Sequence, residues 1–201
     1  MAISVRVKTV LFSVFDGKLH IYLPDRRLPQ SLLTRGSSLN RIAMQVIEKV
    51  TGKAVNESYL EQLYTFSHPF DANLQTDIVY YLLAGADRIN PDFRDAWMET
   101  DKTTKHLSES GVINYALQRL RWKIEYTNVV YSLLPREFTL SELQKIYEAI
   151  LGKKLDKRNF RRKILSLGLL RTSGRKKTGL KARPAKMYMF RRRTPMMVNV
   201  F

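Results

Sequence analysis

The residues best suited to recognition chemistry lie in one short run near residue 160. The sequence KRNFRRK at 157–163 places guanidinium, amide and ammonium groups around a single aromatic residue, Phe160. In the major groove of DNA, Arg can donate two hydrogen bonds to guanine, and Asn pairs in a similar way with adenine. The residues predicted to contact DNA are Lys157, Arg158, Asn159, Arg161, Arg162 and Lys163, of which the three arginines and Asn159 are expected to read base edges.

A second basic run, SGRKKTGLKARPA at 173–185, contains Gly174 and Gly179 and is expected to form a loop. Basic side chains in such a loop touch phosphates, which position a protein on DNA without reading its sequence. The predicted phosphate contacts are Arg175, Lys176, Lys177, Lys181 and Arg183.

Two short helices are expected to present the first run. Thr139 and Glu142 have the T-x-x-E spacing of a capping box, and an apolar stripe follows them. Asp156 is placed to cap the second helix. Two helices joined this tightly, with the second one basic at its start, are typical of a helix-turn-helix with a recognition helix. The residues expected on the inward side of that helix are Phe160, Ile164 and Leu167.

Strand-like segments at 169–172 and 186–190 flank the glycine-containing basic run. The order helix, helix, strand, basic loop, strand is the outline of a winged helix, whose wing lies on the phosphate backbone. We therefore expect a winged helix-turn-helix domain over residues 135–201.

The distribution of charge favours a polyanionic partner for this half of the chain. Residues 1–100 carry 11 basic and 11 acidic residues, whereas residues 101–201 carry 24 and 7. The formal net charge of +17 therefore belongs to the second half alone. Such asymmetry is typical of proteins that bind nucleic acid or an anionic membrane. A solubilising tail is the alternative, but the apolar residues among the basic residues of the second half favour a folded nucleic-acid module.

Composition excludes several classes of protein. The 201 residues are 44% apolar and 26% charged, which is the balance of a globular chain with a real core. No apolar run approaches the ~18 residues of a membrane span, and the N-terminus lacks the regions of a signal peptide. Because there are no cysteines, disulfides and thiolate sites are excluded, and a reducing cytosol suits the chain. The three histidines lack metal-ligand spacing, so we expect no metal and no cofactor.

The first hundred residues predict an α+β domain with a mixed or antiparallel sheet. Val5 to Leu23 has the pattern of a β-hairpin, because Asp16-Gly17 suits a type I′ turn between two β-rich runs. Further along, YLEQLYTFSH and TDIVYYLLAG are strand-like and are joined by PFDANLQ, which is expected to be a loop.

Between these strands, an apolar stripe from Leu39 to Val50 predicts a helix that Ser38 caps and Gly52 ends. This helix, followed by YLEQLYTF at 59–66, resembles a Nudix domain. A Nudix hydrolase carries the motif GX5EX7REUXEEXGU, in which U is aliphatic and the glutamates hold Mg²⁺ against a diphosphate.

The motif's acidic ligands are absent here. When its last glycine is aligned on Gly52, the two adjacent metal-binding glutamates fall on Lys49 and Val50. Only Glu48, at a variable position, is acidic. We therefore expect no hydrolysis by the Nudix mechanism. The remaining motif positions fall on Ser31, Ser37, Gln45 and Val46.

Binding of a phosphorylated small molecule remains compatible with this domain. Loop residues Arg26, Arg27 and Arg35 offer bidentate donors to phosphate, and Phe66 and His68 are placed to line a pocket. The predicted ligand-binding residues are Arg27, Arg35, Phe66 and His68. A solvated arginine surface and a structural histidine are the plainer alternatives.

The middle of the chain is expected to join two domains. Residues 88–107 are polar and predict a domain edge, and a helical pattern then runs from Glu109 to the stop before Pro135. This region is expected to connect the domains or to form a dimerisation face. The predicted division is 1–107, a catalytically degenerate Nudix-like sensor; 108–134, the connecting helix region; and 135–201, the winged helix.

The run TLSELQKIYEAILGKKLDKRNFRRKILSLGLL at 139–170, with RPA at 183–185 and MYMF at 187–190, resembles the C-terminal domain of the Nudix-related transcriptional regulators. YLEQLYTF, ALQRLRWKIEY and LLPREFTL are similar to the same family, so the resemblance covers roughly residues 5–190.

The resemblance implies a homodimeric repressor or activator that binds double-stranded operator DNA in the bacterial cytoplasm, at the nucleoid. In this family the Nudix-like domain senses a small molecule. In well-known branches the effector is ADP-ribose or a related nucleotide and the targets are NAD-metabolism genes, whereas other branches regulate sugar use.

Three features depart from the family pattern. The Nudix motif is more eroded than in many members, PFDANLQT replaces an arginine-rich loop, and no aromatic-Asp-His run precedes Gly111. The first two bear on the nucleotide effector and leave the DNA-binding prediction unchanged. Two other functions stay open at this point: nucleic-acid binding without sequence preference, and a Nudix pyrophosphohydrolase.

Overall fold

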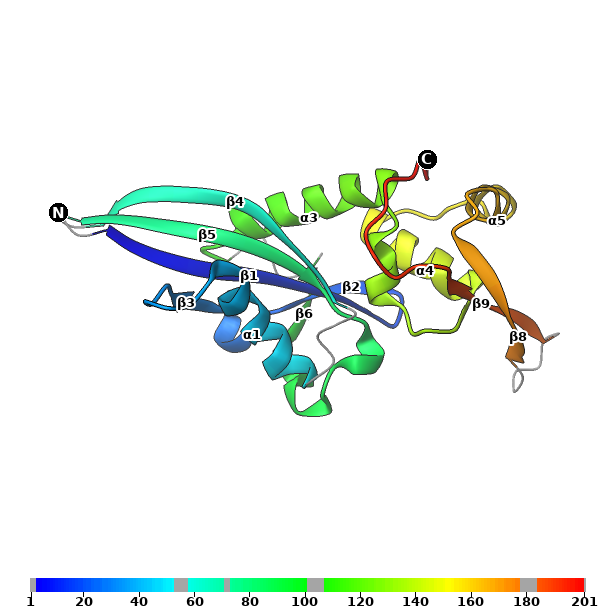
Figure 1. The fold of residues 1–201 in the computed structure, drawn as a ribbon, viewed down its shortest axis with the longest axis horizontal. Coiled ribbons are helices and arrows are strands. Elements are labelled where there is room, and N and C mark those ends of the chain that lie inside the picture. Colours follow the sequence, from blue (N-terminus) through cyan, green and yellow to red (C-terminus); the bar gives the residue numbers. More distant parts are fainter. Residues whose placement is uncertain (1–2, 53–57, 71–72, 101–106, 178–183, 201) are drawn as a thin grey trace.

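The computed structural model describes residues 3–52, 58–70, 73–100, 107–177 and 184–200. A long β-sheet and a winged helix lie at opposite ends of an elongated molecule (Figure 1). One helix, α3 (Ser110–Tyr126), runs along the sheet toward the winged helix.

The sheet is mixed, as the sequence predicted. Its order is β4-β5-β1-β2-β6, with β3 paired to β1 off this path. Strand β1 is parallel to β5 and antiparallel to β2, which makes β1 the centre of the domain. The strands are β1 (Ile3–Phe15), β2 (Lys18–Tyr22), β3 (Gln30–Leu32), β4 (Tyr59–Phe70), β5 (Asn73–Leu83) and β6 (Trp97–Glu99).

The predicted hairpin forms at the predicted turn. Asp16 has a φ of 50° and Gly17 a φ of 74°, so both central residues have the positive φ that a type I′ turn requires. The strands then pair from Phe15 and Lys18 outward.

The prediction of a loop at PFDANLQ was wrong. Strand β4 continues to Phe70 and β5 begins at Asn73, and these two residues are paired with each other. Pro69 is tolerated because β4 is the edge strand, whose outer side needs no ladder hydrogen bond. Pairing along β5 therefore overrides a local sequence that favours a turn.

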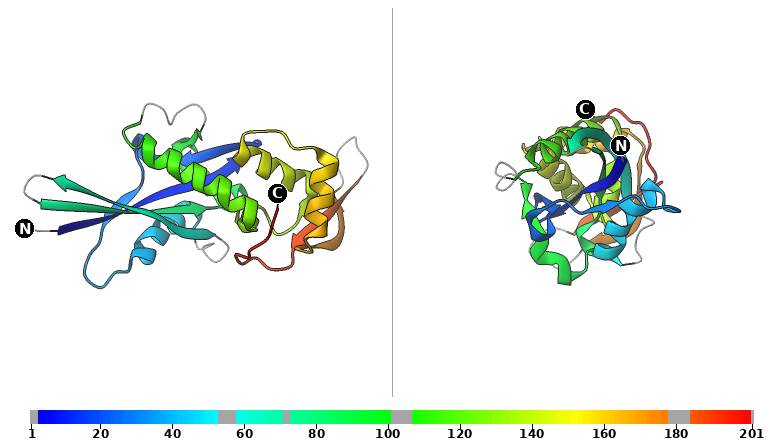
Figure 2. Two further views of the ribbon diagram at one scale, coloured as in Figure 1. Left: turned by 90° about the horizontal axis from the view of Figure 1, so that it is seen from above. Right: turned by 90° about the vertical axis from the view of Figure 1, so that its left-hand side faces the viewer.

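A helix covers each face of the sheet (Figure 2). On one face, α1 (Leu39–Thr51) begins at Ser38, whose side chain accepts a hydrogen bond from the Arg41 backbone N–H, and ends at Gly52. These boundaries match the prediction. On the other face lies α3, whose buried side is Ile113, Ala116, Leu117, Leu120 and Ile124.

The described part of the predicted domain edge, residues 88–100, belongs to the sheet domain. Trp97 is buried and pairs with Tyr22, which makes β6 a further strand beside β2. The Thr100 hydroxyl donates to the Leu19 carbonyl. The polar composition of this segment reflects two short 3-10 helices, at Ala86–Arg88 and Pro91–Ala96, rather than a linker.

The C-terminal part is a winged helix, as predicted. Helices α4 (Leu140–Leu151) and α5 (Lys157–Ser166) precede β8 (Leu170–Lys177) and β9 (Ala185–Phe190). A short strand that the sequence did not indicate, β7 (Phe138–Thr139), completes a sheet of order β7-β9-β8.

One apolar core runs from the long sheet through α3 into the winged helix. The buried 3-10 helix Val129–Leu133 joins the two parts. Across the junction, the Arg121 guanidinium donates to the Ile150 carbonyl at 2.9 Å, and Arg88 donates to the Ser132 carbonyl. The two parts are therefore packed against each other within one protomer. No helix among the described residues is long and apolar enough to cross a membrane.

Candidate nucleic-acid interface

Helix α5 is anchored by its apolar side. Phe160 and Ile164 are buried, and the Phe160 ring meets Tyr147 of α4 at a centroid distance of 5.4 Å. Asp156 caps the helix by accepting from the Asn159 backbone N–H at 2.8 Å. The sequence indicated the cap and the two buried positions. Leu167, the third residue expected on the inward side of this helix, is only half-buried.

The opposite side of α5 is open to solvent and basic. Arg162 donates from Nη2 to the Asn159 side-chain oxygen at 2.9 Å, which holds an amide and a guanidinium side by side at the surface. Such a pair supplies donors and acceptors of the kind that base edges present in a major groove. The exposed residues of the predicted set are Lys157, Arg158, Asn159, Arg162 and Lys163.

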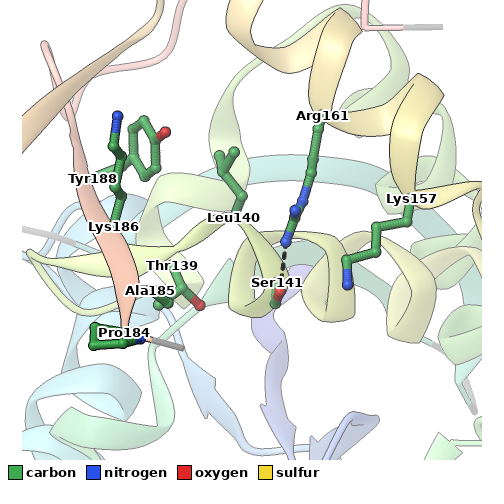
Figure 3. A pocket seen from close by; sticks show the side chains of 9 residues that line it. All are labelled: Thr139, Leu140, Ser141, Lys157, Arg161, Pro184, Ala185, Lys186 and Tyr188. Atoms are coloured by element: carbon green, nitrogen blue, oxygen red, sulfur yellow. Dashed lines mark hydrogen bonds between the residues drawn. The ribbon is translucent and has the colours of Figure 1, made fainter. Parts of the chain in front are cut away.

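Arg161 differs from the other arginines of this helix. Its side chain is half-buried and turns back toward α4, where Nη2 donates to the Ser141 hydroxyl at 3.1 Å (Figure 3). The sequence indicated neither the partner nor the direction.

The wing residues lie partly on a strand. Arg175, Lys176 and Lys177 belong to β8, which extends further than the predicted strand at 169–172. The predicted contacts Lys181 and Arg183 lie outside the described residues.

Two of the wing cations are held by acidic side chains near the start of α4. Lys177 Nζ lies 2.6 Å from Glu142 Oε1, and Arg175 Nη1 lies 3.4 Å from Glu137 Oε2. Lys176 is exposed. These pairs link β8 to the start of α4.

Glu142 has two structural roles. Its carboxylate accepts from the Thr139 backbone N–H at 2.7 Å, and Thr139 Oγ1 accepts from the Glu142 N–H at 3.2 Å, which is the predicted capping box. Burial raises the pKa of Glu142, but hydrogen bonds from Lys177 and Thr139 outweigh it and lower the pKa overall. One carboxylate therefore contacts both the start of α4 and the end of β8.

A cleft of about 460 Å³ opens between the start of α4, one side of α5 and strand β9 (Figure 3). Several of its residues carry no local sequence signal, because the cleft forms only where three separate elements meet. The lining residues are Thr139, Leu140, Ser141, Lys157, Arg161, Pro184, Ala185, Lys186 and Tyr188.

The candidate ligand residues of the sheet domain are spread over several segments. Arg27 and Arg35 are exposed on the loops before and after β3. Phe66 is half-buried on β4 and contacts Tyr64 at a ring distance of 4.9 Å. No hydrogen bond or ring contact among the described residues joins Phe66 to either arginine. The His68 backbone pairs with Gln75, and its side chain lies outside the described set.

The positions of the Nudix motif have become packing and surface positions. Val50 is fully buried, Lys49 lies over the Phe93 ring at 5.9 Å, and Glu48 pairs with Arg41 at 2.8 Å. Among the described residues, no group of three or more Asp, Glu, His or Cys side chains is arranged to hold a metal ion.

Known proteins share this architecture. Residues 130–190 match the family model of the NrtR DNA-binding winged helix domain. The ADPR responsive transcriptional repressor NtrR of Acinetobacter baylyi is 28% identical, over 92% of this chain and 80% of the repressor. Shewanella oneidensis NrtR, crystallised with a 27mer DNA, has the same fold with a TM-score of 0.79, 24% identity and 93% of each chain covered. A MutT/nudix family protein from Enterococcus faecalis gives 0.62 and 18% identity, over 95% of this chain and 87% of that one.

The fold and the site define a protein in which a Nudix-like domain is packed on a winged helix. With the family match and the relative that spans most of the chain, they confirm the resemblance seen in the sequence. The match over residues 130–190 and the similarity to the repressor over most of the chain support a Nudix-related transcriptional regulator.

Proposed function

We propose that this protein is a sequence-specific DNA-binding transcriptional regulator, and that its Nudix-like domain binds a small metabolite that adjusts operator binding. The observation that carries the proposal is the exposed Asn159–Arg162 pair on the outer side of α5, a helix whose inner side is fixed in the core. The name of the Acinetobacter baylyi relative favours repression and an ADP-ribose effector. A related nucleotide or a sugar-type metabolite is the second choice.

In this proposal helix α5 and the wing contact different parts of the DNA. The exposed residues of α5 enter the major groove, whereas the wing lies on phosphates, which position the protein without carrying sequence information. On contact with DNA, phosphates would replace Glu142 and Glu137 as partners of Lys177 and Arg175.

Asn159→Ala is expected to weaken discrimination at one base pair of the operator by about 1–3 kcal/mol, because an amide–adenine pair would be lost. The measurement is fluorescence anisotropy with single-base variants of a duplex selected by the wild-type protein from a random pool. Asn40→Ala is the matched control, since Asn40 is an exposed asparagine on α1. Unchanged base preference at every position in Asn159→Ala would contradict the assignment.

We also propose that the working unit is a homodimer. Two recognition helices related by a twofold axis would then meet half-sites about one helical turn apart. The exposed aromatic residues of α3, Tyr115 and Trp122, favour the predicted dimerisation role for the 108–134 region. Light scattering is expected to give twice the chain mass, and a monomer mass at micromolar concentration would contradict this.

The junction between the Nudix-like domain and the winged helix is where metabolite binding would affect DNA binding. A cleft of about 260 Å³ lies between the turn at Gly17 and helix α4, and its wall includes Glu142, the residue that holds the wing. A metabolite that shifts this junction would change DNA affinity by a coupling free energy of roughly 1–3 kcal/mol.

The alternatives predict different results. A binder without sequence preference would show equal affinity for all duplexes. A Nudix pyrophosphohydrolase would show Mg²⁺-dependent turnover of ADP-ribose, which we do not expect because Lys49 and Val50 stand at the metal-binding positions. A cytoplasmic location, with the protein on the nucleoid, follows from the proposed function.

A further inference from the structure

We infer that the cleft between α4, α5 and β9 is a seat for one phosphate of the DNA backbone, and that Arg161 is a phosphate anchor there rather than a base reader. The inference rests on the proposed function, because it assumes that the winged helix binds DNA. It revises the role that the sequence suggested for Arg161.

The first support is the direction of the Arg161 side chain. It leaves α5 toward Ser141 of α4 rather than along the exposed side that carries Asn159 and Arg162. Base edges in a groove are read from that exposed side, so a side chain turned between two helices is badly placed for them.

The second support is the unused hydrogen-bonding capacity of the guanidinium. Arg161 Nε is buried and has no hydrogen-bond partner among the described residues, and Nη2 has only the Ser141 hydroxyl. A guanidinium offers five N–H donors in a planar fork that matches the oxygens of a phosphate. A buried donor without a partner is unfavourable, and Arg161 lines the cleft, so a phosphate there would satisfy the guanidinium once the side chain turns toward it.

The third support is the sign of the lining. Lys157 from α5 and Lys186 from β9 join Arg161, and the hydroxyls of Ser141 and Tyr188 add neutral donors. Among the described residues that line the cleft, none is acidic. Three cations and two hydroxyls from three elements therefore line one cleft, and a lining of this charge suits a phosphodiester group.

The assignment gives α5 two functional sides. Its exposed side would read bases, while the side facing α4 would fix where the backbone crosses the domain. A phosphate held by α4, α5 and β9 together sets how deeply α5 enters the groove.

The test compares full-length Arg161→Ala and Lys186→Ala with the wild-type protein, after circular dichroism has shown that the variants are folded. Each protein selects duplexes from a random pool, and its affinity for the wild-type selected duplex is then measured against salt concentration. Both variants are expected to select the same sequence, to bind about tenfold more weakly, and to show a salt slope smaller by about one unit.

Arg161→Lys separates anchoring from base reading. A lysine keeps the charge that a phosphate needs but loses the planar fork that pairs with guanine, so it is expected to restore most of the affinity with an unchanged selected sequence. A changed base preference in Arg161→Ala, or undiminished affinity in both alanine variants, would overturn the inference while leaving the regulator intact. If the wild-type protein selects no sequence at all, the proposed function fails instead, and the salt slope on random duplex still tests the phosphate seat.

Discussion

Replacing Asp77 with Asn is expected to destabilise the folded protein by about 3 kcal/mol, because it removes the carboxylate that pairs with Arg6 and one of the two carboxylates, with Glu109, that pair with Lys8. The Asp77 side chain on β5 is only 4% exposed. It accepts from Arg6 Nε at 2.8 Å and Nη2 at 2.9 Å, and Lys8 Nζ lies at 3.2 Å. Arg6 is one quarter exposed, so water compensates for part of the loss and we expect the lower end of the range for buried pairs.

Asp77 also makes the stability of the folded protein depend on pH. Burial raises the pKa of Asp77, but hydrogen bonds from Arg6 and Lys8 outweigh it and hold the pKa well below its usual range. A carboxyl with a depressed folded-state pKa stabilises the protein above its unfolded pKa of about 4, and this contribution is lost as the pH falls further. The difference in unfolding free energy between wild type and Asp77→Asn should therefore shrink between neutral pH and about pH 3.

Urea unfolding at the two pH values measures this difference. Asp95→Asn is the control, because Asp95 is an exposed acid of the same domain and should change stability by no more than about 0.5 kcal/mol. If Asp77→Asn proved as stable as the control at neutral pH, the ion-pair account of the sheet would be wrong.

Phe138→Ala is expected to cost about 3–5 kcal/mol, because it empties a fully buried site at the junction of the wing sheet and α4. The Phe138 ring lies 5.3 Å from that of Phe190, and its backbone pairs with Tyr188 through β7. Phe138→Leu keeps most of the apolar volume and should lose much less.

Because the apolar core is continuous, the loss of stability in Phe138→Ala should affect both the sheet domain and the winged helix. In a Trp122→Phe background, which removes the other tryptophan of the chain, Trp97 reports on the sheet domain by fluorescence, while DNA binding reports on the winged helix. We expect the two signals to be lost at the same denaturant concentration, shifted downward together in Phe138→Ala. Loss of DNA binding with an unshifted Trp97 transition would show that the two parts unfold independently.

The elements that the sequence predicted well depend on local signals. The capping box at Thr139, the cap at Asp156 and the turn at Asp16-Gly17 each act within a few residues, and each is found where expected. The spacing of apolar residues every three or four positions in α1 and α5 is likewise a local signal, because it lies within a single helix.

What the sequence did not indicate depends on partners far along the chain. Strand β7 is two residues long and exists because β9, some fifty residues later, pairs with it. The tip of the β4–β5 pair carries Pro and Asn and is nevertheless extended, because long-range pairing outweighs local turn preference.

The candidate site shows the same division. The basic residues of α5 were identifiable from their types and spacing, but not the inward turn of Arg161 toward Ser141 or the pairing of Lys177 with Glu142. Those contacts join residues 20 and 35 positions apart, which no local pattern encodes.

Sequence-specific DNA binding under metabolite control is tested most directly by a competition experiment. A labelled duplex from upstream of the protein's own operon is followed by fluorescence anisotropy at ~150 mM salt, with excess random duplex, with and without ADP-ribose. We predict tight binding that survives the competitor and is released by ADP-ribose. Binding that does not change with ADP-ribose would leave the DNA-binding assignment in place and direct the search for an effector toward sugars. Binding that disappears with competitor at every upstream site would contradict the claim that this protein is a sequence-specific regulator.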